Sequence, residues 1–343
     1  MLDRAEPLAI YMEGEVEGNV GKMGIGILRY SPNPVVCVID SATAGRDAAE
    51  VTGVPRPCPI VSSVEEATAL GAKVLVLGIA PPGGLIPPHW YPVMDAAWAS
   101  GLSLVNGLHD LLGPRYAGRA KPGQWVWDIR IEPTGLGVGG GLAAGLINKR
   151  VLMIGTDMAV GKMTAGLEIY RGAREHGVKA EFIATGQIGI TITGSGVPLD
   201  AVRIDFASGA IEAEVMRVPN AELVIIEGQG ALIHPGSSAN LPLLRGSCPT
   251  HLVLCARAGQ THLARLPHLA IPPLGDYIRM YEDLAEACGT FPRPHTAAVC
   301  LNTFGLNDED ASAGAEALES EVGLPVVDPV RHGTERILEV LGY

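Results

Sequence analysis

The chain has 343 residues, of which 47% are apolar and 18% are charged, so global disorder is excluded. Its 37 acidic and 25 basic side chains give a formal net charge of −12, which argues against nucleic acid or an anionic membrane as a partner. At roughly 100 to 200 residues per domain, the length predicts two domains.

The six cysteines are dispersed and form no C-x-x-C pair, which favours a reducing, cytoplasmic location over a disulfide framework. The acidic N-terminus lacks the pattern of a signal peptide. The longest apolar run, residues 135–147, is too short for a membrane-spanning helix, so we expect no membrane segment.

In the first part of the chain, near-continuous apolar runs predict buried parallel strands at 8–12, 34–39, 73–79 and 102–105. Helices are expected between them, at 63–70 with Ser63 as the N-cap and at 92–99 before Gly101. This alternation predicts a Rossmann-like domain over residues 1–135.

A Gly-rich stretch at 136–148 interrupts the pattern and is expected to be a linker. Beyond it, strands are predicted at 151–154, 180–184, 223–226, 251–255 and 297–301, with helices at 165–176 and 333–341. The predicted fold class is therefore α/β with two domains, the second of them spanning 149–343 around another parallel sheet.

The strand at 151–154 leads into a Gly-rich turn, the dipeptide Gly-Lys and a helix, which is the sequence context of a P-loop. In such a turn, backbone N–H groups and the positive end of the helix converge on a phosphate, and the lysine adds a mobile charge. The residues expected to bind a cofactor here are Gly155, Thr156, Asp157, Ala159, Val160, Gly161, Lys162, Met163 and Thr164.

This turn departs from the common P-loop pattern in two ways. Five residues separate Gly155 from Gly161, and Met163 replaces the hydroxyl residue that would bind magnesium. A thioether is a poor ligand for a hard cation. We therefore expect diphosphate binding, no metal and no nucleotide hydrolysis.

The form Gly-Thr-Asp-x-x-Val-Gly-Lys resembles the P-loop of dethiobiotin synthetase. A second element supports the comparison, because the apolar strand at 223–226 ends in Glu227-Gly-Gln-Gly and so brings a carboxylate to the carboxyl edge of the sheet. The two segments are expected to share one pocket.

Over its whole length the chain resembles a family that long carried only an unknown-function label. The shared features are the Rossmann-like first half, Thr185-Gly-Gln-Ile-Gly189, Asp200-Ala-Val-Arg-Ile-Asp-Phe206 and Glu227-Gly-Gln-Gly-Ala-Leu-Ile-His-Pro235. Its characterised members are D-glutamate N-acetyltransferases of the DgcN type. The resemblance implies acetyl transfer from acetyl-CoA to the amino group of D-glutamate or a related D-amino acid.

Acetyl transfer to an amine needs a base for the ammonium proton and a donor for the developing oxyanion. The candidates for the base are Asp205 and Glu227, then His234, with Asp157 behind them. Asp205 has an alternative use as a capping or loop residue, and His234 has one as a solvated turn residue.

Substrate binding is expected from amides and polar side chains in the same segments. Gln187 and Gln229 lie in Gly-rich turns, Ser237 lies near His234, and Arg203 is suited to a carboxylate. Arg245 and Arg257 are further arginine candidates. Because no base pairs with Cys248 or Cys255, direct transfer is expected without an acetyl-cysteine intermediate.

Several alternatives stay open at this point. Gly18, Gly21 and Gly24 do not fit G-x-G-x-x-G, so an NAD site in the first domain is disfavoured. An ATP-dependent ligase of the dethiobiotin-synthetase type and a non-catalytic nucleotide or CoA sensor are the rival functions. A small-molecule substrate and a homo-oligomer are expected, although the sequence leaves the number of subunits open.

Overall fold

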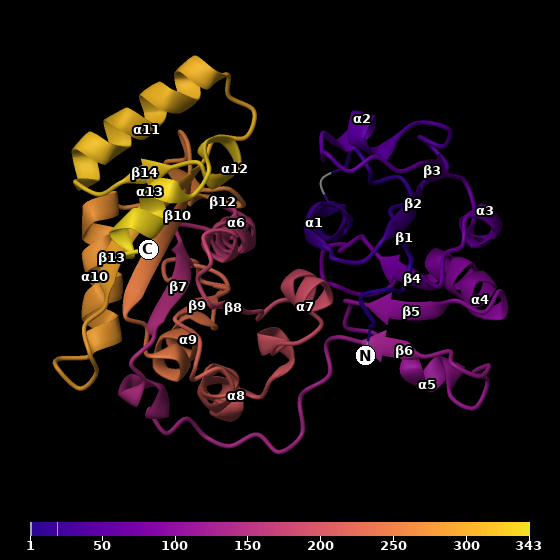
Figure 1. Ribbon diagram of the computed structural model, residues 1–343, viewed down its shortest axis with the longest axis horizontal. Coiled ribbons are helices and arrows are strands. Elements are labelled where there is room, and N and C mark those ends of the chain that lie inside the picture. The colour runs from indigo at the N-terminus through magenta and orange to yellow at the C-terminus, as the bar shows by residue number, and fades with distance from the viewer. Residues whose placement is uncertain (1, 19) are drawn as a thin grey trace. The chain divides into compact units, whose positions relative to one another are not determined.

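The computed structural model describes residues 2–18 and 20–343. The chain divides into two units, one formed by Met1–Ile131 with Gln187–Ala201 and the other by Glu132–Gly186 with Val202–Tyr343 (Figure 1). The chain thus leaves the second unit at Gly186 and returns to it at Val202. The predicted domain limits, 1–135, 136–148 and 149–343, stay a prediction.

The first unit is built on a six-stranded parallel sheet with the order β3-β2-β1-β4-β5-β6, which is the Rossmann order. Residues in β1, β4 and β5 are buried along their whole length, as expected for strands covered on both faces. The strands are β1 (Leu8–Tyr11), β2 (Val35–Ile39), β3 (Ile60–Val61), β4 (Val74–Leu77), β5 (Ser103–Asn106) and β6 (Val126–Asp128).

The helices of this unit are α1 (Lys22–Tyr30), α2 (Ala48–Thr52), α3 (Val64–Ala69), α4 (Tyr91–Ala99), α5 (Gly113–Tyr116) and α7 (Gln187–Thr193), with 3-10 turns η1 (Pro88–Trp90) and η3 (Leu199–Ala201). At the end of β2, the Asp40 carboxylate accepts the N–H groups of Gly14 and Thr43 and the Thr43 hydroxyl. Because its oxygens accept hydrogen bonds from two loops of this unit, Asp40 acts as a structural residue.

The second unit also contains a six-stranded parallel sheet, with the order β14-β13-β10-β7-β9-β8. Its strands are β7 (Lys149–Gly155), β8 (Ala180–Ile183), β9 (Leu223–Ile226), β10 (His251–Arg257), β13 (His295–Asn302) and β14 (Val326–Val327). Because β7 lies between β10 and β9, the segments that follow these three strands meet at one edge of the sheet.

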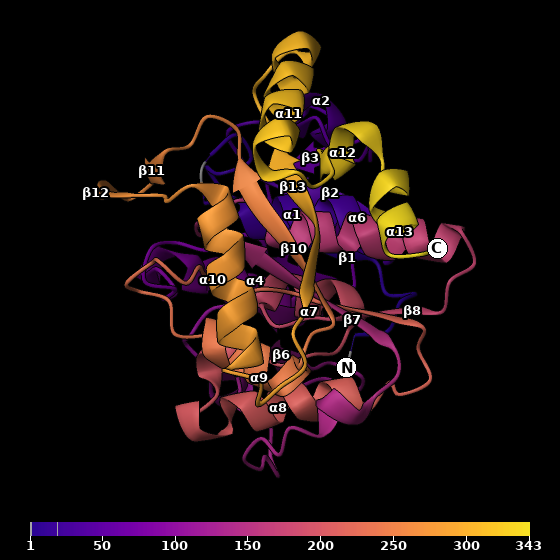
Figure 2. The ribbon, with the colours of Figure 1, turned by 90° about the vertical axis from the view of Figure 1, so that its left-hand side faces the viewer.

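Helices flank this sheet: α6 (Lys162–Glu175), α8 (Ile204–Met216), α9 (Asn240–Ser247), α10 (Leu274–Glu286), α11 (Asp308–Val322), α12 (Pro329–His332) and α13 (Glu335–Val340), with the turn η2 (Leu142–Gly145). An antiparallel hairpin, β11 (His262–Leu263) with β12 (Leu266–Ala270), follows β10. In Figure 2, the arrowhead of β10, the start of α10 and α11 lie at the same end of the sheet.

All nine strands predicted from apolar runs are present within a few residues, and the α/β fold with two parallel sheets is confirmed. The prediction omitted β3, β6 and β14, because two or three residues carry no periodicity signal, and it also omitted the hairpin. The helix after the P-loop begins at Lys162, three residues earlier than predicted. In the described part of the chain, no helix combines the length and apolarity needed to cross a membrane.

Candidate active site at the P-loop

The P-loop connects β7 to α6 through residues 155–161, and its backbone leaves a row of donors free. Ala159 and Gly161 have φ values of 57° and 105°, so two residues of the turn are left-handed. The N–H groups of the six residues 159–164 have no acceptor among the described residues, and the first helical hydrogen bond runs from Ala165 N to Gly161 O. Such a cluster of donors at a helix N-terminus is suited to an anion.

Lys162 lies within this loop rather than in solvent, with 7% of the residue exposed. Its Nζ donates to the Asp157 carbonyl oxygen at 2.8 Å. A Cβ at position 155 would lie 2.9 Å from Nζ, which explains why Gly155 begins the turn. Burial lowers the pKa of Lys162, although the nearby Asp157 and Glu227 oppose this shift.

The carboxylate of Asp157 is fully engaged in holding neighbouring loops. Oδ1 accepts from Met158 N at 2.6 Å, and Oδ2 accepts from Gln260 Nε2 at 2.7 Å and from Ala264 N at 2.8 Å. Asp157 therefore ties the P-loop to the segment between β10 and β12, and both of its oxygens accept hydrogen bonds from the protein.

Glu227 lies directly after β9 and is 5% exposed. Its Oε2 accepts from Thr185 N at 2.9 Å and from Gly186 N at 3.1 Å, whereas no hydrogen bond to Oε1 is present in the described part of the chain. Burial raises the pKa of Glu227 to about 7, and the two N–H donors and Lys162 only partly oppose that effect. A carboxylate with one unbonded oxygen and this pKa is suited to proton transfer near neutral pH.

Two glycines allow the segments around Glu227 to approach each other closely. A Cβ on Gly186 would lie 2.4 Å from Gln229 Nε2 and 3.3 Å from Glu227 Oε1. A Cβ on Gly228 would lie 1.6 Å from the Met153 carbonyl oxygen and 3.2 Å from Lys162 Cδ. The Gln229 amide, the Glu227 carboxylate and the P-loop lysine therefore belong to one site.

The loop after Gly230 contains His234 and Ser237. The Nδ1 atom of His234 accepts from Gly236 N at 3.1 Å, and a Cβ on Gly236 would lie 4.0 Å from Met158 Cε, which places this loop beside the tip of the P-loop. Because Nδ1 accepts this hydrogen bond, the neutral ring carries its proton on Nε2 and is a donor toward any ligand. Ser237 Oγ accepts from Ala231 N and from Asn240 Nδ2, at 3.2 and 2.7 Å.

Among the described residues, two other predicted residues of the second unit make no hydrogen bond to this group, and a third belongs to the first unit. Arg203 Nε donates to both carboxylate oxygens of Glu132, at 3.0 and 2.9 Å. Asp205 is exposed in the first turn of α8. Gln187 begins α7 and belongs to the first unit. No hydrogen bond or ion pair in the described part of the chain joins Arg203 or Asp205 to the P-loop.

Sequence reasoning missed two tyrosines of α10. The Tyr277 hydroxyl donates to the Gly155 carbonyl oxygen at 2.8 Å and accepts from Leu232 N at 3.2 Å. The Tyr281 hydroxyl donates to Asn240 Oδ1 at 2.9 Å. They hold the loop of His234 against the end of β7. Their four-residue spacing predicts a shared helix face but not these partners.

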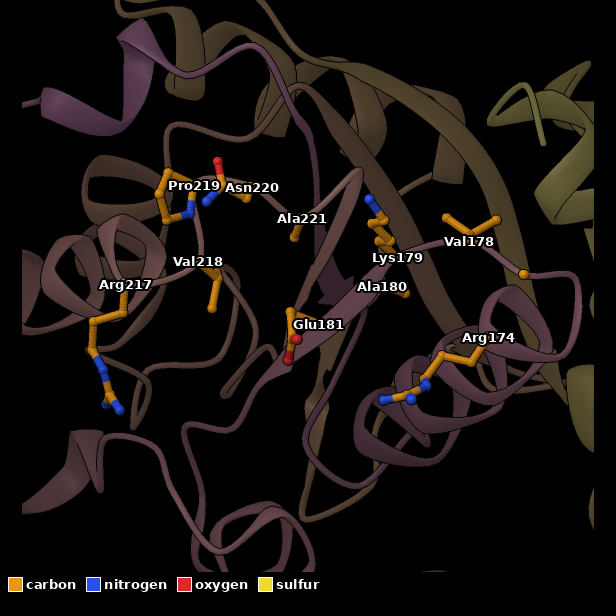
Figure 3. Close-up of a pocket in the computed structure, with 11 residues that line it drawn as sticks. Arg174, Val178, Lys179, Ala180, Glu181, Arg217, Val218, Pro219, Asn220 and Ala221 are labelled. Atoms are coloured by element: carbon orange, nitrogen blue, oxygen red, sulfur yellow. The ribbon is translucent and has the colours of Figure 1, made fainter.

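Two cavities border the second sheet at opposite edges. One, of about 560 Å³, lies at the amino ends of β8 and β9, where Figure 3 shows Arg174 and Arg217 on either side of Glu181. Arg174 donates to the Tyr170 hydroxyl and Arg217 to Glu214. The other, of about 470 Å³, includes Thr156 and lies at the carboxyl edge, where ligands of open α/β sheets bind.

Comparison with known proteins gives two family matches. Residues 137–338 match a domain of unknown function described as the DUF1611 P-loop domain, and residues 41–132 match the DUF1611 Rossmann-like domain. A crystal structure of a DUF1611 family protein from Anabaena variabilis has a TM-score of 0.95 and 46% identity, and the match covers 98% of this chain and 99% of that one.

Two curated relatives carry the name D-glutamate N-acetyltransferase. The protein from Tritonibacter scottomollicae is 34% identical over 98% of this chain and 98% of its own length. The protein from a Pseudoalteromonas species is 37% identical over 80% of this chain and 83% of its own length. The family resemblance inferred from the sequence is thus confirmed. The chain belongs to the DUF1611 family and is an enzyme of the N-acetyltransferase class.

Proposed function

We propose that this enzyme transfers the acetyl group of acetyl-CoA to the amino group of D-glutamate or a related D-amino acid. The names of the two relatives support the substrate. The observation that carries the proposal is the juxtaposition of six unpartnered N–H groups at the P-loop with a buried carboxylate, Glu227, whose pKa is raised to about 7.

The P-loop fits the diphosphate of CoA. Its N–H groups match phosphate oxygens, and Lys162 Nζ, which now donates only to a carbonyl oxygen, adds a positive charge. The next position carries the thioether of Met163, a weak ligand for magnesium. We therefore assign the loop to holding a diphosphate that stays intact, without a metal.

Glu227 is proposed as the general base. Its Oε1 takes a proton from the substrate ammonium, and the resulting amine attacks the thioester carbonyl carbon. The C–S bond breaks, the CoA sulfur leaves as a thiolate, and the second proton of the nitrogen neutralises it. The amide of Gln229, packed beside Glu227 at Gly186, is placed to donate to the oxyanion.

The other candidates take lesser parts in this scheme. His234 and Ser237, in the loop beside the P-loop, are proposed to contact the substrate as donors. The Nε–H of Arg203 is shared with Glu132, so Arg203 is proposed to reach a substrate carboxylate through its terminal N–H groups. Gln187 and Asp205 stay as predictions, and so does the homo-oligomer.

The test is release of free CoA thiol from acetyl-CoA in the presence of D-glutamate, with mass-spectrometric detection of N-acetylglutamate. We expect turnover in EDTA and none with ATP and magnesium alone. Formation of ADP would favour the ligase, and thermal stabilisation by acetyl-CoA without turnover on any D- or L-amino acid would favour the sensor.

A further inference from the structure

The cavity of about 470 Å³ beside the P-loop has no role in the scheme above. Apolar side chains make up much of its wall, among them Ile271, Pro272, Leu301 and Leu318, and its volume is in the range of small-molecule sites. It lies at the ends of β10 and β13, whereas Glu227 follows β9. Since β7 runs between β10 and β9, the P-loop separates the cavity from the proposed base.

Among the described residues that line this cavity, Arg257 carries the positive charge. It is exposed, and its guanidinium has no hydrogen bond or ion pair to any described residue. In the second unit, every other arginine except Arg265 donates to a carboxylate, a carbonyl or a hydroxyl. A guanidinium left free at the mouth of a cavity is suited to phosphate.

A second unpartnered group lies at the P-loop end of the cavity. Thr156 lines the cavity and is 1% exposed, and its hydroxyl has no hydrogen-bond partner among the described residues. A buried hydroxyl without a partner is destabilising unless a ligand supplies one. Glu321 also lines this cavity, and its carboxylate can accept a hydrogen bond from an amino or hydroxyl group of a ligand.

We propose that this cavity binds the adenosine end of the CoA donor, with Arg257 paired to its 3′-phosphate and Thr156 hydrogen-bonded where the ligand meets the P-loop. This inference rests on the proposed function. The donor would then lie across the loop, with adenosine between the apolar walls, the diphosphate on the free N–H groups and the thioester on the side of Glu227.

The kinetic test compares acetyl-CoA with 3′-dephospho-acetyl-CoA. A charge-assisted pair with phosphate gives the wild-type enzyme about tenfold or greater preference in kcat/KM for acetyl-CoA. Arg257→Ala should bring this ratio close to one and leave the KM for D-glutamate unchanged. The matched control is Arg265→Ala, which removes an equally unpaired arginine outside the cavity and should keep the wild-type ratio.

A binding test does not depend on turnover. Adenosine 3′,5′-bisphosphate, titrated calorimetrically, should bind the wild-type protein and bind about tenfold more weakly to Arg257→Ala. Thr156→Val, which is nearly isosteric, should weaken the same titration. If Arg257→Ala keeps the wild-type preference for acetyl-CoA over 3′-dephospho-acetyl-CoA, the assignment is wrong. If Arg257→Ala raises only the KM for D-glutamate, the cavity binds the amino acid and not the donor, which also overturns the assignment. Failure of the wild-type enzyme to use acetyl-CoA would instead refute the proposed function.

Discussion

Replacement of Glu227 by glutamine separates the catalytic role of this carboxylate from its effect on stability. Burial raises its pKa from 4.5 to about 7, so the folded protein holds a proton that the unfolded chain has already lost in this pH range. The contribution of Glu227 to stability is therefore present below pH 4.5 and declines as the pH rises through 7. At 1.36 kcal/mol per pKa unit, ionised Glu227 costs the folded state about 3 kcal/mol at pH 8.

Glutamine does not titrate, so Glu227→Gln should gain stability over the wild type as the pH rises. From pH 5 to pH 8 the gain grows by about 2.5 kcal/mol, or about 5 to 10 °C in Tm. Thermal melts at the two pH values measure this difference. A Tm difference that does not change with pH would refute the burial argument.

The same variant should lose turnover if Glu227 is the base. In the wild type, kcat should fall about tenfold per pH unit below pH 7 as Glu227 is protonated. Asp205→Asn serves as the matched control, because Asp205 is exposed and no hydrogen bond joins it to Glu227 in the described part of the chain. If Glu227→Gln keeps full activity and Asp205→Asn loses it, Asp205 and not Glu227 is the general base.

Three further changes test the site. Lys162→Ala should raise the KM for acetyl-CoA about tenfold or more. It should also move the acid limb of the kcat profile to higher pH, because the charge of Lys162 lowers the pKa of Glu227. An acid limb at the wild-type pH would contradict this coupling between Lys162 and Glu227. Tyr277→Phe removes the hydroxyl bonded to Gly155 O, so urea unfolding should show about 1 to 3 kcal/mol lower stability. Gly228→Ala places a Cβ 1.6 Å from the Met153 carbonyl oxygen, so circular dichroism should show no folded protein. The control Gly275→Ala should fold normally, because a Cβ at position 275 meets no atom within 4 Å.

The P-loop and Glu227 were predictable because both signals are local. A buried strand, a Gly-rich turn and a helix follow one another between Lys149 and Glu175, and the strand Leu223–Ile226 delivers Glu227 to the edge of a parallel sheet. The glycines at 186 and 228 also mark close approaches, although their neighbours Gln229 and Met153 lie more than 40 residues away in the sequence.

The uses of individual side chains required the tertiary structure. Asp157 and Glu227 are both buried carboxylates, but partners more than 100 residues away occupy Oδ2 of Asp157, while Oε1 of Glu227 stays unbonded. Likewise, Arg203 pairs with Glu132, whereas the guanidinium of Arg257 has no partner among the described residues, although the sequence presents the two arginines as similar candidates.

Sequence alone thus determined the nine parallel strands of four or more residues and the position of the phosphate-binding turn, because apolar periodicity and glycine spacing act over a few residues. Tertiary structure decided which polar groups are satisfied, how far Glu227 is desolvated and which cavity adjoins the loop. These properties depend on segments brought together by β7, β9 and β10, which no local pattern specifies.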